Sequence, residues 1–267
     1  MTRAHASQRD LRYYTRNGHS QQIGLLAQYA PALAIAHQAQ WLDALLNRSI
    51  PRDGDTGRPK AAAGLRTLVA VDLEQIFEAE ALVRRRYALQ GYEMPVTQNF
   101  GEGIIEAAAG LTIVAINGGA LRGTLTVRPD SPTGLAAEKT FCGEIENLRR
   151  QGRRIAEIVR LAVEDDGADG RAVLQAMIQS AYLLARVVHS LTDVVIEVNP
   201  RHVRFYRRVL GFVIVAPERL CARAGAPAVL MRLDVNEFGR RLHSGAGARA
   251  GDFNWQALRA GYRGAGL

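Results

Sequence analysis

The segment that most constrains the fold is DVVIEVNPRHVRFYRRVLGF at residues 193–212, because it encodes a strand, a sharp turn and a helix in direct succession. Residues 194–198 form a short, mostly β-branched run, which predicts a buried strand, and Asn199-Pro200 ends it. Apolar side chains, Tyr206 among them, then recur at helical spacing as far as Gly211. This order predicts a strand whose end faces the first turns of a helix, with one phenol turned back toward the strand.

The composition is that of a soluble globular protein, with 48% hydrophobic and 22% charged residues, which excludes a disordered chain. No apolar run reaches the ~20 residues that a membrane span needs. The opening MTRAHASQRD carries no apolar stretch of the kind found in signal peptides. Cys142 and Cys221 are the only cysteines and do not form a metal-spaced cluster, so we expect a cytoplasmic protein.

The net charge of +8 is carried almost wholly by arginine, since Lys60 and Lys139 are the only lysines. Clustered arginines attract phosphate groups and acidic protein partners, although the same clusters also occur as solvated helix faces. The chain has no helix-turn-helix, zinc-finger or aromatic RNA-binding signature, so no nucleic-acid partner is expected. The clusters lie at residues 84–86, 149–154, 201–208 and 240–241.

Three regions follow from the pattern along the chain. Residues 23–47 have apolar side chains in helical phase, and residues 48–60 are rich in Pro, Gly and charge. We therefore predict a helical N-terminal appendage with a linker over residues 1–60, one folded domain over residues 61–236, and a Gly- and Arg-rich tail over residues 237–267.

Within the predicted domain, strand and helix patterns alternate around a hairpin signal at Asn117-Gly118-Gly119. This mixed order predicts an α/β fold of three layers with a mixed, strongly twisted sheet. The predicted helices cover residues 73–89 and 171–190, and the predicted strands cover residues 68–71, 111–116, 121–127, 155–163, 194–198, 213–216 and 229–235.

The final strand and helix resemble those of the GNAT acyltransferases, in which an Asn after the strand is followed seven positions later by a Tyr and then by Gly-Phe. Here these residues are Asn199, Tyr206 and Gly211-Phe212. The resemblance covers about residues 65–235 and implies that Tyr206 protonates a departing pantetheine sulfur, a role that suits a phenol because it donates a proton without carrying charge at neutral pH. A tyrosine packed in a helical core is the alternative reading.

The strand EIVRLAV carries Glu157 and Arg160, two charges that are costly in an apolar strand unless they are used or paired. Three positions apart, they lie on opposite faces unless a bulge intervenes. Glu-x-x-Arg resembles the acyl-homoserine-lactone autoinducer synthases, and with Tyr206 and the ending CARAGAPAVLMRLD it resembles the long-chain N-acyl amino acid synthases. The resemblance implies Glu157 as the base for the amine and Arg160 as a substrate contact. The alternative is a structural ion pair between Glu157 and Arg160 at a sheet edge.

The same resemblance extends to the stretch RRRYALQGYEM, which is similar to the helix and loop that line the substrate site of autoinducer synthases. It implies Arg86 and Tyr92 as substrate-binding residues, together with Glu102 in a mobile loop and Asn199 at the strand end. Tyr92 stands where that family has a Trp.

The donor turn departs from the acetyl-CoA enzymes, whose Gly-rich turn cradles pyrophosphate at a helix N-terminus. Residues 164–171 read EDDGADGR, and this acidic run repels pyrophosphate. Gly170 and Arg171 remain the candidate donor-binding residues. The departure favours an acyl-phosphopantetheine arm on an acidic carrier protein over acyl-CoA as the donor. We also expect no permanently bound cofactor and no metal.

We therefore expect an N-acyltransferase that moves a medium or long acyl chain from an acyl carrier protein, or from acyl-CoA, to the α-amine of an amino acid. Its partners would be the carrier protein and the amino acid, with transient membrane association through the product. Two alternatives stay open: an acetyl-CoA-dependent N-acetyltransferase, and a non-catalytic module that keeps only the fold. The oligomeric state is left open.

Overall fold

The structure is a computed structural model. It describes residues 64–70, 73–92, 110–164, 168–188, 190–221 and 223–244. The predicted appendage at residues 1–60, the chain beyond residue 244 and the candidate Glu102 lie outside the described residues.

One mixed sheet organises the described residues, with seven strands in the order β1-β2-β3-β4-β5-β7-β6. Neighbouring strands are antiparallel except β4 and β5, which are parallel. The predicted α/β class is confirmed. The strands are β1 (Arg66–Val69), β2 (Leu111–Asn117), β3 (Ala120–Pro129), β4 (Ile155–Val163), β5 (Asp193–Val198), β6 (Val213–Cys221) and β7 (Ala226–Asp234).

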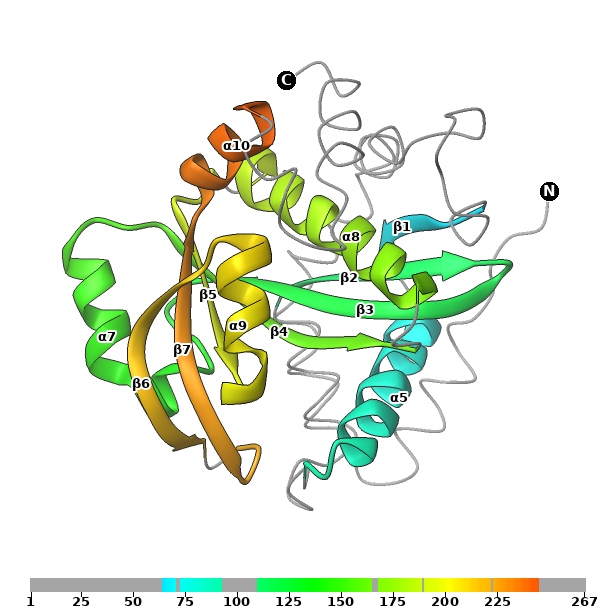
Figure 1. The fold of residues 1–267 in the computed structure, drawn as a ribbon, viewed down its shortest axis with the longest axis horizontal. Helices are drawn as coiled ribbons and strands as arrows, with labels where there is room; N and C mark the ends of the chain where they lie inside the picture. The colour runs from blue at the N-terminus through cyan, green and yellow to red at the C-terminus, as the bar shows by residue number, and fades with distance from the viewer. Residues whose placement is uncertain are drawn as a thin grey trace.

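Helices cover both faces of the sheet and complete the three layers. On one face, α5 (Leu73–Leu89) packs against β3 and β4 and α7 (Glu138–Arg150) packs against β6. On the other face, α8 (Ala168–Leu183) crosses β1 to β3 and lies in front of the sheet with α9 (Figure 1). The remaining helical segments are η2 (Leu184–Val188), η3 (Pro200–His202), α9 (Val203–Phe205), η4 (Tyr206–Leu210) and α10 (Val235–Ser244).

The sequence predicted several elements at their observed bounds, among them α5 at residues 73–89 and β4 at residues 155–163. It missed α7, although Phe141, Ile145 and Leu148 of that helix are buried at helical spacing. The reason is that charged residues and Gly143 dilute the apolar signal.

The loop expected between the last two strands is wrong, because most of it is strand. The expected loop covers residues 218–228, but β6 continues to Cys221 and β7 begins at Ala226. Strand β6 is the edge strand of the sheet, and its pairing with β7 shifts register near Pro217. Proline is tolerated at sheet edges and bulges because its missing N–H leaves no pairing group unsatisfied there.

Helix α10 crosses residue 236, where the sequence places the end of the domain. Its Phe238 is buried in the main core and packs on Tyr182 of α8, with ring centroids 5.2 Å apart. Gly239 lies so close to the Tyr182 hydroxyl that a β-carbon would stand 2.4 Å from it. The packed domain therefore continues into α10.

The parallel strands β4 and β5 pair at one end and then separate. Their register runs from Ile155↔Asp193 to Glu157↔Val195 and stops there. Beyond Glu157, β4 pairs only with β3 among the described strands, while β5 continues beside β7. Backbone polar groups along the separated edges are available to a ligand.

We expect two glycine substitutions to change stability in opposite directions. Gly211 ends η4 with φ +82°, so Gly211→Ala should destabilise the protein by about 1–2 kcal/mol. Gly143 is exposed inside α7, with open space where a β-carbon would stand, so Gly143→Ala should stabilise it by about 0.5–1 kcal/mol. Urea denaturation of both variants checks the signs, and equal signs would contradict the assigned backbone conformations.

Candidate active site

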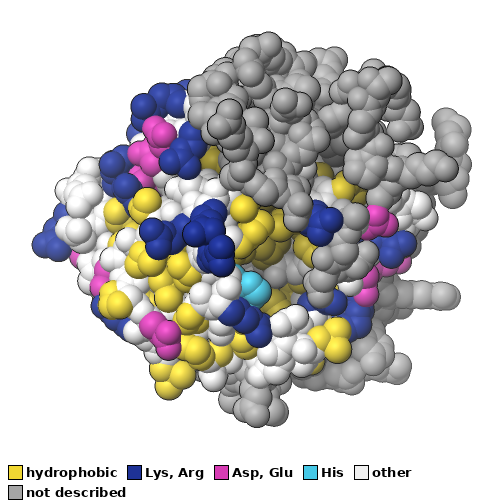
Figure 2. All heavy atoms as spheres, in the orientation of Figure 1, with side chains coloured by type: hydrophobic (Ala, Val, Ile, Leu, Met, Phe, Trp, Pro, Cys, Tyr) yellow, Lys and Arg dark blue, Asp and Glu magenta, His cyan; other side chains and the backbone are white. Residues whose placement is uncertain are grey.

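A cavity of about 460 Å³ opens where β4 and β5 separate. Its wall is formed by β4 from residue 157 to 163, β5 from residue 196 to 198, the end of α5, the segment η3–α9–η4, and the turn between β6 and β7. In Figure 2, basic side chains gather over α9 beside a hollow with hydrophobic side chains. The cavity is of the size that small-molecule sites occupy.

A β-bulge brings Glu157 and Arg160 to one face of β4. Thr124 of β3 pairs with Ala162 and Thr126 pairs with Val159, so Arg160 and the residue after it lie opposite a single residue of β3. Arg160 adopts a left-handed backbone conformation with φ +59°, which is uncommon for a residue with a side chain. The bulge cancels the alternation of an ideal strand, and both side chains point to the α5 and α7 side.

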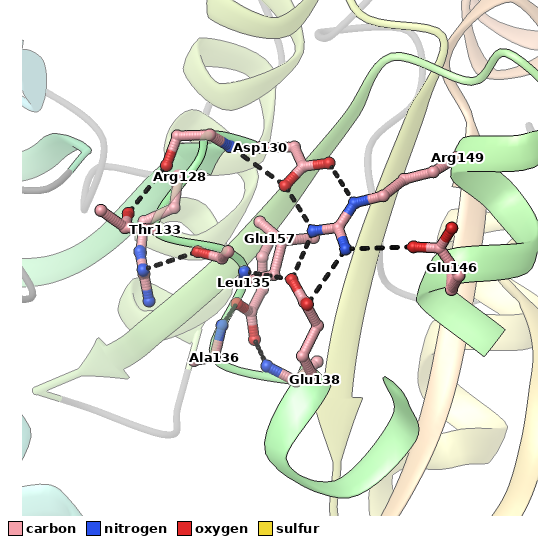
Figure 3. A network of polar contacts seen from close by, with 12 residues as sticks. Arg128, Asp130, Thr133, Leu135, Ala136, Glu138, Glu146, Arg149 and Glu157 are labelled. Carbon is pink, nitrogen blue, oxygen red and sulfur yellow. Dashed lines mark hydrogen bonds and ion pairs between the residues drawn. The ribbon is translucent and has the colours of Figure 1, made fainter. Parts of the chain in front are cut away.

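Glu157 lies on β4, is fully buried and binds the backbone just before α7. Its Oε2 accepts the N–H of Ala136 at 2.7 Å, and its Oε1 accepts the N–H of Ala137 at 3.1 Å (Figure 3). Burial raises the pKa of Glu157 to about 7, against the opposing charge of Arg223. A carboxyl that titrates near neutral pH is suited to accept a proton.

Arg149 holds the loop that presents these two N–H groups. Its guanidinium donates from Nε and Nη2 to Asp130, both at 2.7 Å, and from Nη1 to Glu138 at 3.0 Å (Figure 3). Glu138 Oε1 in turn accepts the N–H of Leu135 at 2.6 Å, and the Arg149 hydrogen bonds lower the pKa of Glu138. The loop from Asp130 to Ala137 is thus fixed at both ends.

We expect Arg149→Met to lower the catalytic rate by about tenfold, because a looser loop no longer holds the Glu157 carboxyl in one position. The substitution keeps the stem that covers the loop while removing the charge. Steady-state kinetics at pH 7.5 measure the effect. Arg150→Met, at an exposed position one residue further along α7, serves as the control, and equal rates for both variants would contradict the positioning role.

Arg160 lines the cavity and forms an ion pair with Glu80 of α5, whose carboxylate also accepts a hydrogen bond from Arg84 Nε at 2.7 Å. The Glu80 side chain is fully buried and that of Arg160 is 7% exposed. Burial lowers the pKa of Arg160 to about 10, so the guanidinium stays charged at neutral pH. The alternative of an ion pair between Glu157 and Arg160 is therefore wrong, because Arg160 pairs with Glu80 while the Glu157 carboxyl accepts the N–H groups of Ala136 and Ala137.

Tyr206 starts η4 and lines the cavity opposite β4. Its ring packs edge-on against Phe205 and Phe212, with centroids 5.4 Å and 5.6 Å away. Burial, with a smaller effect from Tyr87, raises the pKa of Tyr206 above its ordinary value. The phenol therefore keeps its proton at neutral pH and can donate it in a hydrogen bond.

Arg86, Tyr92 and Asn199 also line the cavity. Arg86 Nη1 donates to the carbonyl of Glu164 at 3.3 Å, at the far end of β4, and Tyr92 accepts a hydrogen bond from Arg201 Nη2 at 2.8 Å. Asn199 Oδ1 accepts the Arg201 N–H at 3.2 Å, which shapes the turn after β5.

The two candidate donor-binding residues lie elsewhere. Gly170 is buried and Arg171 is exposed in the first turn of α8, and neither is among the residues that line the cavity. Glu102 lies outside the described residues.

The family model for the N-acyl amino acid synthase FeeM matches residues 78–234 of this chain. This range contains all the residues that line the cavity. The chain belongs to the FeeM family. Its membership and its fold make it an N-acyltransferase.

The solved structure of FeeM agrees with this assignment. FeeM, an N-acyl amino acid synthase from uncultured soil microbes, is 25% identical over 65% of this chain and 92% of its own, with a TM-score of 0.56. Two acetyltransferases are less similar in structure: an aminoglycoside N(6′)-acetyltransferase from Legionella pneumophila (12% identity, 67% of this chain, 96% of its own, TM-score 0.47) and an N-acetyltransferase from Staphylococcus aureus Mu50 (10%, 65%, 99%, 0.46). The comparison with curated proteins gave no match.

The cavity of this FeeM family member contains charged residues that the sequence analysis did not select. Glu197 of β5 and Arg223 of the β6–β7 turn both line it, and Glu80 supports Arg160 from behind. A signal for Glu197 was present, since it is a lone charge in the apolar run VVIEV. Glu80 carried none, because one glutamate in an amphipathic helix usually faces solvent.

Within the described part of the chain, no three His, Cys, Asp or Glu side chains are grouped as a metal site would require. The helices described there include none that is long and apolar enough to cross a membrane.

Proposed function

We propose that this N-acyltransferase moves a medium or long acyl chain from a carrier thioester to the α-amine of an amino acid. The observation that carries the proposal is the buried Glu157, a carboxyl with a pKa of about 7 on the wall of a cavity at the separation of β4 and β5. An amino acid presents its amine mainly as an ammonium at neutral pH. The amine attacks a thioester only after it loses a proton, which Glu157 accepts directly or through a water.

The acyl carbonyl would lie along the separated edge of β4. Backbone N–H groups there can donate to the oxygen that becomes negatively charged when the amine nitrogen bonds to the carbonyl carbon. When the carbon–sulfur bond then breaks, the sulfur takes the electron pair. Tyr206 would donate the proton that turns the thiolate into a thiol. The attacking nitrogen, now bonded to the carbonyl carbon, would lose its second proton to solvent, and the Tyr206 phenolate would take one proton back from solvent.

The apolar wall of the cavity supports an acyl chain longer than acetyl. Leu161, Leu174 and Phe205 come from three different elements and line the same space. A chain of methylenes gains free energy from leaving water for such a surface, at about 0.8 kcal/mol for each buried CH₂.

The basic face supports a carrier protein as donor over acyl-CoA. Arg204, Arg207 and Arg208 are exposed on α9 and η4, the segment whose Phe205 and Tyr206 line the cavity, and they match an acidic carrier. Figure 2 shows basic side chains gathered over α9. At the start of α8, Gly170 and the exposed Arg171 would contact the phosphate of the phosphopantetheine arm. We place the reaction in the cytoplasm, with transient membrane association through an acylated product.

Product analysis tests the proposal. The purified full-length chain is mixed with a pool of the twenty amino acids and one of three donors: a dodecanoyl carrier protein, dodecanoyl-CoA or acetyl-CoA. Mass spectrometry should find an N-dodecanoyl amino acid, formed fastest from the carrier protein. Product from acetyl-CoA alone would overturn the proposal in favour of an acetyltransferase, and no product from any donor would favour a non-catalytic module.

A further inference from the structure

Glu197 is a second carboxylate at the point where β4 and β5 separate. Glu157 pairs with Val195 of β5, and Glu197 follows Val195 by two residues, so it lies on the same face of the sheet as Glu157. Both side chains line the cavity. The negative charge of Glu197 contributes to the raised pKa of Glu157, which agrees with their proximity.

Arg223 reaches Glu197 from the turn between β6 and β7. Its Nη2 donates to Glu197 Oε2 at 2.5 Å, and the two side chains are 21% and 6% exposed. Arg223 is also the strongest opposing charge on Glu157 and contributes to the lowered pKa of Arg160. One end of the cavity therefore combines two carboxyls with a guanidinium that interacts with Glu197, Glu157 and Arg160.

The second oxygen of Glu197 distinguishes this pair from the pair that Arg219 forms with Glu144 near the same turn. Oε1 is buried and has no hydrogen-bond partner among the described residues. By contrast, Arg219 bonds both oxygens of Glu144, at 3.0 and 2.5 Å. A purely structural pair gains from such two-point contact, whereas a buried carboxylate oxygen left without a donor is costly.

We propose that Glu197 and Arg223 form the acceptor subsite and recognise a free α-amino acid by both of its charges. Glu197 Oε1 accepts a hydrogen bond from the ammonium, beside the Glu157 carboxyl that takes its proton. The Arg223 guanidinium attracts the α-carboxylate, a role that Arg160 is less able to fill because Glu80 holds it on the other side. This inference rests on the proposed function and narrows its acceptor to a zwitterion, excluding peptide side-chain amines and amines without a neighbouring carboxylate.

Acceptor kinetics test the subsite, with the amino acid found in the product assay and its α-amide as the two acceptors. Glu197→Gln should raise the KM for the amino acid by about tenfold or more, the loss of one charged hydrogen bond, while the KM for the thioester donor stays unchanged. Arg223→Gln should remove the preference for the free acid over its amide, which we expect to exceed about tenfold in the unaltered protein.

Arg219→Gln is the matched control, because Arg219 lies on β6 near the same turn and pairs with Glu144 outside the cavity. The double variant Glu197→Gln/Arg223→Gln removes both charges together. If a single variant fails to fold, the acceptor KM and the preference for the free acid are measured in the double variant instead. An unchanged acceptor KM in Glu197→Gln, or an intact preference for the free acid in Arg223→Gln, would overturn the subsite. Absence of product from the unaltered protein would instead count against the proposed function.

Discussion

Glu157→Gln is expected to lower kcat by about 10²-fold or more, because the amide cannot take a proton from the acceptor ammonium. The substitution keeps the shape of the side chain and one acceptor oxygen for the N–H groups of Ala136 and Ala137. The KM for the thioester should change little, since the donor is bound mainly by other parts of the cavity. Steady-state kinetics with saturating amino acid measure the change.

The pH dependence sharpens this test. With a pKa of about 7, Glu157 is half ionised at neutral pH, so the rate of the unaltered protein should rise through pH 7 and level off above it. The residual rate of Glu157→Gln should lack that limb. Glu218→Gln, on the exposed part of β6, provides a control that should keep both rate and profile. A Glu157→Gln variant that retains the full rate would contradict the catalytic role of Glu157. Its role would then be structural, as an acceptor for the N–H groups before α7.

Strand β4 shows most clearly which features could be predicted from the sequence and which could not. Its bounds and its two charges could be predicted, because a long apolar run with two charged interruptions is a local signal. The bulge at Arg160 could not, since it depends on how β3 and β4 pair. The sequence therefore left open whether Glu157 and Arg160 share a face, and only the register settles it.

The partners of the candidate residues were the hardest part to predict. Glu80 is far in the sequence from its partner Arg160, and Arg223 is far from its partner Glu197. Neither position stands out locally, since Glu80 lies in a helix and Arg223 in a turn. Only the folded chain brings them to the cavity. The fold class was easier to predict, because it depends on the order of elements, and neither the missed helix α7 nor the edge strand β6 predicted too short changes that order.

The stability of the protein should depend on pH through Glu157 even without substrate. Its carboxyl has a pKa of about 7 in the folded chain and an ordinary value of 4.5. Below about pH 4.5 the group is protonated in both states, and its contribution to stability is fully present. As pH rises toward 7, the unfolded chain releases the proton first, so stability falls by about 3 kcal/mol in all and then levels off.

Comparison with Glu157→Gln isolates this effect, because the amide does not titrate. The hydrogen bonds of arginine lower the pKa of Glu138 and Glu144, so these groups act in the opposite direction and weaken the fold as pH falls. They are the same in both proteins and cancel in the difference. Urea denaturation at pH 4.5, 6 and 8 should show the stability of the unaltered protein falling relative to Glu157→Gln. A flat difference would mean that Glu157 ionises at its ordinary pKa and is held as an anion by the start of α7, which leaves no carboxyl tuned to accept a proton at neutral pH.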